Sequence, residues 1–286
     1  RAGKAVKPLP MYVNASLAGP SNVPDPAGVA SGGPQQDVLD IWKAAAPSID
    51  FQAPDIYDGK SAHVVQYLDK YARPDNALMV PEIGNSLLFA RYFYEAIGRG
   101  AIGFAPFGMD RSGYFNYPLG AKALDEKVIG AFARPYAMIG SIMRDWARLS
   151  YAHPTWGSAK PDDGSPVSTI MGNWKITGEW GQWQFGMKEW KMFAAEPPAA
   201  AAEPVGGFAL IQLAADEFLL VGDHARVTFE PAPDSPPNGI MLRVEEGQFE
   251  QGTWKMTRIW NGDQTDYGLN LTDRPQVLKV TMGHYR

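Results

Sequence analysis

The sequence predicts an α/β region followed by an all-β region, and three observations support this prediction. In residues 1–150, short apolar runs alternate with segments whose apolar residues recur at helical spacing, an order that produces a parallel sheet. The spacing of the predicted strand ends is regular, because Tyr57, Glu82 and Phe107 follow one another at intervals of 25 residues. After residue 150, short strand-like segments are separated by Gly, Pro and Asp, which is typical of a β-sandwich or barrel.

Four strands and four helices are expected in the first region. The strands are predicted at 11–14, 55–57, 77–82 and 101–108, and the helices at 37–46, 62–71, 87–98 and 122–149. A segment rich in Gly, Pro and Ser at 19–34 predicts a loop. Each strand ends in polar or aromatic residues, which are Asn14, Asp55 with Tyr57, Glu82 and Phe107.

The strand that ends near Glu82 is the one around which the first region is organised. An apolar run from Ala77 to Val80 is typical of a strand buried on both faces, and Pro81 and Gly84 end it. An acid at the carboxyl end of such a strand lies where open α/β sheets and (β/α)8 barrels have their active sites. The alternative is a solvated loop glutamate, since Glu is mostly exposed in proteins.

The four strand–helix units leave two architectures open. A closed (β/α)8 barrel needs eight units and roughly 250 residues, whereas this region offers four units in 150 residues. The region is therefore either a small open sheet or half of a barrel. Half a barrel would leave two unpaired sheet edges, so the first four strands would have to come from other residues of the same or a second chain. We expect the sequence to begin inside a domain, because a strand-like run starts at Pro10, close to Arg1.

Composition argues against several classes of function. The net charge is -5 with acids and bases interspersed, so there is no basic stripe to bind nucleic acid or an anionic membrane. Cysteine is absent and the four histidines are far apart, so neither a metal site nor a cofactor is predicted. No run of eighteen apolar residues is present to span a membrane. The letters of a dinucleotide fingerprint occur at Gly98–Gly103, but they follow a helix and enter a strand, which is the reverse of the required order.

The second region is expected to begin at residue 151, which gives predicted domains of 1–150 and 151–286. Turn-forming residues at 153–156 and 161–166 indicate a linker or domain boundary, and Pro197–Pro204 an exposed loop. A hairpin is predicted to turn at Gln251-Gly252. Strands are predicted at 167–171, 182–187, 207–213, 218–221, 226–230, 240–245, 254–260 and 277–282.

Five tryptophans lie within residues 156–190, and their role is open at this stage. They are Trp156, Trp174, Trp180, Trp183 and Trp190. An exposed row of such rings would stack against sugars, but Trp is usually well buried. Since their spacing does not place them on one exposed face, packing in the core is favoured.

The chain resembles bacterial β-galactosidases of glycoside hydrolase family 35. The residues that carry this resemblance in the first region are Pro10–Ala15, Asp50–Tyr57, Val80-Pro81-Glu82 and Gly103–Gly108. They resemble the fifth to eighth strands of the family's barrel. The second region resembles the β-domain of unknown function that follows the barrel, at Asp216–Phe218, Val221-Gly222, Glu245–Phe249 and Asn261–Gln264.

The resemblance implies a fold and a catalytic role for Glu82. The fold would be the C-terminal half of a (β/α)8 TIM barrel followed by an all-β, sandwich-like domain. Glu82 would be the nucleophile of retaining glycoside hydrolysis, in which a second carboxyl group about 5 Å away protonates the leaving oxygen. In this family that acid/base is a Glu preceded by Asn at the end of the fourth strand. The sequence contains no Asn-Glu pair, so we expect the acid/base in the absent N-terminal half.

The other strand ends receive supporting roles. Tyr57 is expected to hydrogen-bond either the nucleophile or the sugar, and Asn14 and Asp55 to bind sugar hydroxyls. Phe107 is expected to stack under a pyranose ring. Packing, or for Asp55 a turn, is the alternative for these residues. Tyr114 lies in the loop after the last strand, where barrel loops build specificity.

The leading hypothesis is an exo-acting β-galactosidase of bacterial carbohydrate metabolism, periplasmic or secreted, that acts on a β-galactoside or related oligosaccharide. Another retaining β-glycosidase, acting on glucosides, mannosides or plant-wall oligosaccharides, is the first alternative. The second is a non-catalytic carbohydrate-binding module, which gains support if these residues form the complete polypeptide. A homo-oligomer is compatible with the sequence.

Overall fold

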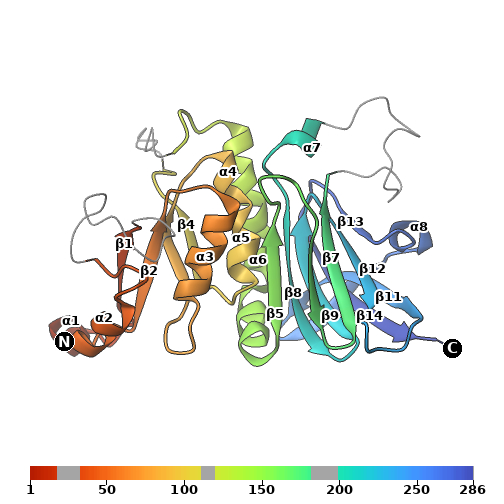
Figure 1. Cartoon of the computed structure of the whole chain (residues 1–286), viewed down its shortest axis with the longest axis horizontal. Coiled ribbons are helices and arrows are strands. Elements are labelled where there is room, and N and C mark those ends of the chain that lie inside the picture. Colours follow the sequence, from red (N-terminus) through yellow and green to blue (C-terminus); the bar gives the residue numbers. More distant parts are fainter. Residues whose placement is uncertain (18–32, 111–119, 182–198, 286) are drawn as a thin grey trace. The chain divides into compact units, whose positions relative to one another are not determined.

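The structure is a computed structural model that describes residues 1–17, 33–110, 120–181 and 199–285 (Figure 1). The chain divides into two compact units. The first comprises Arg1–Phe89 and Arg99–Val128, and the second comprises Ala90–Gly98 and Ile129–Arg286. The domain limits predicted from the sequence, 1–150 and 151–286, stay a prediction.

The first unit contains the parallel sheet that the sequence predicts. Its strands are β1 (Tyr12–Ser16), β2 (Phe51–Ile56), β3 (Met79–Ile83) and β4 (Gly103–Pro106). They pair in the order β1-β2-β3-β4, and every pair is parallel. The α/β class of the first region is thereby confirmed.

The helices of the first region are α1 (Ala2–Val6), α2 (Leu39–Ala45), α3 (Ser61–Tyr71) and α4 (Leu87–Ala90). In α3, Val64, Leu68 and Tyr71 are buried at helical spacing together with Tyr67, and this apolar face lies against β2. The helix predicted at 87–98 is divided, because α4 ends at Ala90 and α5 (Tyr92–Ile97) begins two residues later. Arg91 between them keeps helical dihedral angles (φ -60°, ψ -29°).

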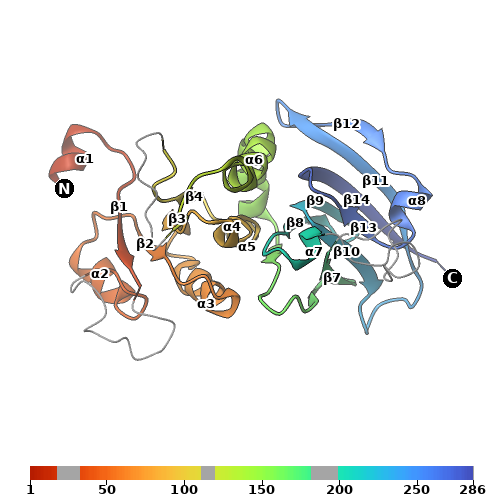
Figure 2. The ribbon, with the colours of Figure 1, turned by 90° about the horizontal axis from the view of Figure 1, so that it is seen from above.

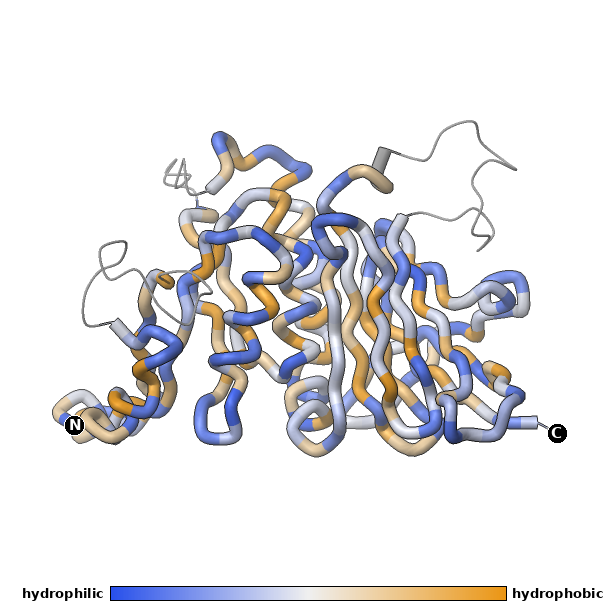
Figure 3. Tube along the Cα trace, in the orientation of Figure 1, coloured by the Kyte–Doolittle hydropathy of each residue, from blue (hydrophilic) through white to orange (hydrophobic). Residues whose placement is uncertain are grey.

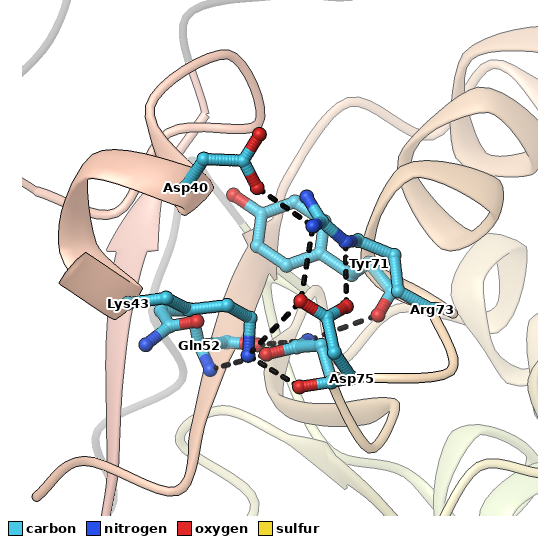
Figure 4. Close-up of polar contacts among 7 residues, drawn as sticks. Asp40, Lys43, Gln52, Tyr71, Arg73 and Asp75 are labelled. Carbon is cyan, nitrogen blue, oxygen red and sulfur yellow. Dashed lines mark hydrogen bonds and ion pairs between the residues drawn. The ribbon is translucent and has the colours of Figure 1, made fainter. Parts of the chain in front are cut away.

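A polar cluster lies at the amino-terminal end of β2, away from Glu82 (Figure 4). Buried Asn76 accepts a hydrogen bond from the Gln52 backbone N–H and donates to the Gln52 and Tyr71 carbonyls, each at 2.9 Å. On the exposed side of the cluster, Arg73 forms ion pairs with Asp40 at 2.6 Å and with Asp75 at 2.8 Å. The exposed ion pairs contribute at most about 1 kcal/mol each, so the buried amide of Asn76 is the stronger link between α3 and β2.

The second unit combines α5 and most of α6 (Glu126–Ala152) with two antiparallel sheets. One sheet has the order β13-β10-β7-β6, and the other has the order β12-β11-β14-β9-β8-β5. Hydrophobic residues run along these strands in Figure 3. The two sheets share one core that includes Ile176, Phe208, Leu220, Val227 and Val280. An α/β region followed by antiparallel β-sheets is therefore what the chain forms.

The strands of the second unit are seen from above in Figure 2. Their bounds are β5 (Thr155–Ala159), β6 (Val167–Met171), β7 (Trp174–Trp180), β8 (Gly207–Ala214), β9 (Glu217–Asp223), β10 (Ala225–Pro231), β11 (Gly239–Glu250), β12 (Thr253–Ile259), β13 (Leu269–Leu271) and β14 (Gln276–His284). Two further short helices are α7 (Ala199–Ala202) and α8 (Gly262–Thr265).

Most of the predicted β-segments coincide with observed strands, and the predicted hairpin is confirmed. Glu250 pairs with Thr253 across the turn. Gln251 and Gly252 both have positive φ, at 52° and 80°, as the tight turn between two twisted strands requires. The strand predicted at 182–187 lies outside the described residues.

Two sequence-based interpretations need comment. The linker or boundary predicted at 153–156 and 161–166 is wrong in its first stretch, because β5 begins at Thr155 and pairs along its whole length with β8. The preference for a core role of the tryptophans is confirmed for Trp174 and Trp180, which are 0% and 8% exposed. Trp156 packs against the same core. Trp183 and Trp190 lie outside the described residues.

Candidate active site

Asn14, Asp55 and Glu82 come from three adjacent strands and lie on one face of the parallel sheet. Asp55 pairs in register with Ser16 on β1 and with Glu82 on β3, and Asn14 pairs with Ala53. Side chains two residues apart on a strand point to the same face. Asn14 therefore shares a face with Ser16, and Ala53 shares one with Asp55. The carboxyl ends of the strands bring these residues together although they are 41 and 27 positions apart in the chain.

The Glu82 carboxylate is held by two hydrogen-bond donors. The Tyr57 hydroxyl donates to Oε2 at 2.9 Å, and Asn14 Nδ2 donates to Oε1 at 3.2 Å. Each donor binds a different oxygen, so the two hydrogen bonds together restrict rotation of the carboxylate group. A side chain held in this way is suited to present an ionised oxygen to an electrophile in one direction.

Asp55 is the buried neighbour of Glu82. It is 7% exposed, and its Oδ1 accepts a hydrogen bond from Asn14 Nδ2 at 2.8 Å. Burial raises the pKa of Asp55 from 3.8 to about 6, the hydrogen bond from Asn14 lowers it, and the charge of Glu82 raises it further. Burial of a carboxyl group next to a like charge lowers the stability of the protein. Strongly shifted carboxyl groups therefore cluster at functional sites, where the chemistry requires them.

The β3–β4 pairing is irregular where Glu82 leaves the strand. The register shifts between Val80 and Ile83, so Pro81 and Glu82 have no paired residue on β4. Pro81 has no N–H to contribute to the ladder. Bulges of this kind re-aim side chains next to active sites, and this one accompanies the turn of Glu82 toward Tyr57 and Asn14.

Aromatic residues surround the carboxylate. The Tyr57 ring meets the Phe107 ring edge-on, with the centroids 6.5 Å apart and an interplanar angle of 79°. Phe107 follows β4 directly and is 36% exposed, so it has a surface that can face a ligand. Behind the site, a Cβ on Gly84 would lie 2.2 Å from the Phe89 ring. Gly84 is thus needed for this ring to lie against the chain just after Glu82.

The structure brings together the predicted residues Asn14, Asp55, Tyr57, Glu82 and Phe107 at the carboxyl end of the sheet. Tyr114, the remaining predicted site residue, lies outside the described residues. Ser16 is a neighbour that the sequence did not single out, because a serine at the end of a short strand has no distinguishing pattern. Its place beside Asp55 follows only from the β1–β2 register.

Within the described segments, no group of three or more His, Asp or Glu side chains is arranged to hold a metal ion. None of the helices in those segments is long and apolar enough to cross a membrane.

Comparison with models of known families gives a match in the second unit. Residues 132–272 match the family described as a domain of unknown function, DUF5597, and this domain is associated with glycoside hydrolase 35-like proteins in general. The match covers most of the second unit and none of the parallel sheet that carries Glu82. No curated protein matches the chain. By this comparison, residues 132–272 are similar to the DUF5597 domain that is associated with glycoside hydrolase 35-like proteins.

Proposed function

We propose that this protein is a retaining glycoside hydrolase that releases terminal β-galactosyl residues, with Glu82 as the nucleophile. The observation that carries the proposal is the position of Glu82 at the carboxyl end of β3, where Tyr57 and Asn14 each donate to one of its oxygens. The carboxylate attacks the anomeric carbon and forms a covalent galactosyl-enzyme, which water then hydrolyses.

The hydrogen bonds to Glu82 fit the demands of this reaction. A nucleophilic carboxylate has to stay ionised while the partner acid holds its proton. The Glu82 carboxylate accepts one hydrogen bond on each oxygen, so both oxygens have a fixed partner before a sugar binds. The hydrogen bond from the Tyr57 hydroxyl is the shorter of the two, so Tyr57 contributes more than Asn14 to the orientation of the Glu82 side chain.

The other groups of the site are suited to bind a sugar. From the described residues, no hydrogen bond to Asn14 Oδ1 or Asp55 Oδ2 is found, so both oxygens can accept bonds from sugar hydroxyls. The exposed part of the Phe107 ring can stack against the apolar face of a pyranose. One aromatic ring and a few polar groups that converge on one point are typical of small-ligand sites.

The proposal assigns the acid/base to residues outside these 286. The chain has no Asn-Glu pair, and the parallel sheet has four strands with β1 and β4 at its edges in the described part. We propose that residues of the same or a second chain supply four further strands of a (β/α)8 barrel. The acid/base glutamate would then reach the required separation of about 5 Å from Glu82.

The test is hydrolysis of aryl β-galactosides by the full-length protein. Glu82→Ala should lose nearly all turnover, and added azide should restore it and yield α-galactosyl azide, because azide replaces the missing nucleophile without a second inversion. Glu126→Ala, at the start of α6, is the control and should retain wild-type turnover. Full activity in Glu82→Ala would refute the assignment. Faster turnover of glucosides or mannosides would instead show a different retaining β-glycosidase.

The missing Asn-Glu pair also favours a second candidate, a non-catalytic carbohydrate-binding module. It predicts that the full-length protein binds galactosides in a calorimetric titration and leaves every aryl glycoside intact. Glu82→Ala would then weaken binding but have no turnover to lose.

A further inference from the structure

One amide group in the site serves two carboxylates. Asn14 Nδ2 donates to Asp55 Oδ1 at 2.8 Å and to Glu82 Oε1 at 3.2 Å. An amide nitrogen carries two hydrogens, so both are used when both carboxylates accept. The shorter contact is the one to Asp55, and the orientation of the amide therefore depends on Asp55 at least as much as on Glu82.

The protonation of Asp55 changes what this amide can do. An ionised carboxylate only accepts hydrogen bonds, whereas a protonated carboxyl group also carries an O–H that needs an acceptor. Asn14 Oδ1 becomes such an acceptor if the amide turns over, and Nδ2 then points away from Glu82. A neutral carboxyl oxygen is also a weaker acceptor than a charged one.

Among the residues that the structure describes, few charged or titratable groups lie near Asp55, so few groups other than Asp55 can control the orientation of the Asn14 amide. In the described part of the chain, the titratable groups that interact with Asp55 are Glu82 on β3 and Tyr71 on α3. The Tyr71 hydroxyl donates to the Pro34 carbonyl at 2.6 Å. From β1, the polar residues beside Asp55 are Asn14 and Ser16, and neither of them carries a charge.

We propose that Asp55 is a positioning residue for Glu82: its ionised carboxylate fixes the Asn14 amide so that this amide also donates to Glu82, and protonation of Asp55 releases it. This inference rests on the proposed function of Glu82. It goes further by assigning the acid side of the pH dependence to Asp55. Since burial raises the pKa of Asp55 to about 6, activity should decline as the pH falls through that value.

The kinetic test uses two substrates that differ in their need for a proton donor. Hydrolysis of 2,4-dinitrophenyl β-galactoside needs no acid assistance, whereas phenyl β-galactoside does. We expect kcat/KM of the full-length wild-type protein to fall below about pH 6 for both substrates. Asp55→Asn should lower the plateau, because it removes a carboxylate oxygen that can accept from a sugar hydroxyl. Asn still accepts the hydrogen bond from Asn14 and does not become protonated in this range, so the decline of the variant should begin at least one pH unit lower. The matched control, Asp58→Asn, changes a partly exposed carboxylate three residues away and should retain the wild-type profile.

Three kinetic results would overturn the inference. A decline near pH 6 that persists in Asp55→Asn would belong to another group. If Asp55→Asn lost kcat/KM on phenyl β-galactoside but not on 2,4-dinitrophenyl β-galactoside, Asp55 would be a proton donor to the leaving group. A folded Asp55→Asn variant that is inactive on both substrates at every pH also contradicts it.

A second measurement does not depend on activity. In the wild-type protein, the side-chain amide NMR signals of Asn14 should shift with a midpoint near pH 6, and in Asp55→Asn they should not. Amide signals that ignore pH in the wild-type protein would refute the coupling between Asp55 and Asn14. Coupling in a protein without hydrolytic activity would instead refute the proposed function and leave the coupling in place.

Discussion

Replacing Asp55 by Asn should stabilise the protein at neutral pH, although Asp55 lies in the candidate active site. The carboxyl group is 7% exposed, and burial raises its pKa from 3.8 to about 6. A raised pKa means that the folded state binds the proton more tightly than the unfolded chain does. The free energy of unfolding therefore falls as the pH rises from about 4 to above 6.

The size of this effect follows from the two pKa values. Their difference corresponds to about 3 kcal/mol of stability lost when Asp55 is ionised. Asn has the same shape, carries no charge and still accepts the hydrogen bond from Asn14. We expect Asp55→Asn to raise the free energy of unfolding by about 1 to 3 kcal/mol at pH 7.5, and by much less at pH 4.

The assay is urea unfolding monitored by tryptophan fluorescence, at several pH values from 4 to 7.5. The Asp58→Asn control removes the same charge from the same segment and should leave the pH dependence due to Asp55 in place. The reasoning is refuted if Asp55→Asn is less stable than the wild type at pH 7.5. It is also refuted if the difference between the two proteins is the same at every pH.

Three further substitutions test individual contacts. Tyr57→Phe removes the donor to the nucleophile's Oε2 but keeps the ring, so kcat/KM should fall about 10- to 100-fold, measured with an aryl β-galactoside. Gly84→Ala would place a Cβ 2.2 Å from the Phe89 ring and should cost about 1–3 kcal/mol, measured as a lower midpoint of thermal unfolding. Tyr94→Phe removes the hydrogen bond of 2.7 Å to the buried Asp223 carboxylate and should cost about 1–3 kcal/mol, measured by urea unfolding.

The control for both tyrosine substitutions is Tyr151→Phe, because the Tyr151 side chain is 95% exposed. If Tyr57→Phe keeps wild-type kcat/KM, the hydroxyl does not assist Glu82. An unchanged midpoint in Gly84→Ala would mean that the Phe89 ring moves aside at no cost. Equal stability of Tyr94→Phe and wild type would show that Asp223 finds another donor.

The parallel strands could be located from the sequence because each combines an apolar run with a polar end. The run from Ala77 to Val80 predicted a strand that ends near Glu82, and β3 ends one residue later, at Ile83. The alternation of strands and helices predicted a parallel sheet, and the strands next to Tyr57, Glu82 and Phe107 are neighbours in it. Local pattern was sufficient here, since buried parallel strands differ in composition from the helices between them.

The sharing of the Asn14 amide could not be predicted in the same way. It depends on the register of β1 against β2 and of β2 against β3, and register is set by tertiary pairing rather than by either strand alone. The raised pKa of Asp55 is hidden from the sequence for the same reason, because it arises from burial against distant residues.

Three strands of the second unit, β5, β7 and β13, were not predicted from the sequence, and the reasons differ between β5 and β7. β5 was concealed by turn-forming residues around it, and its pairing with β8 makes it a strand. In β7, residues Trp174, Ile176, Gly178 and Trp180 are buried in strict alternation with less buried ones. That alternation is visible in the sequence, and it is the pattern of a half-buried strand.

The central claim is that Glu82 forms a covalent bond to a galactosyl group, and trapping that bond tests it most directly. The full-length protein is incubated with 2,4-dinitrophenyl 2-deoxy-2-fluoro-β-galactoside, digested, and its peptides are mapped by mass spectrometry. We expect one fluorogalactosyl group per chain, attached to Glu82, and none in Glu82→Gln. A label on a different carboxylate, or hydrolysis of β-galactosides without any trapped intermediate, would contradict the account.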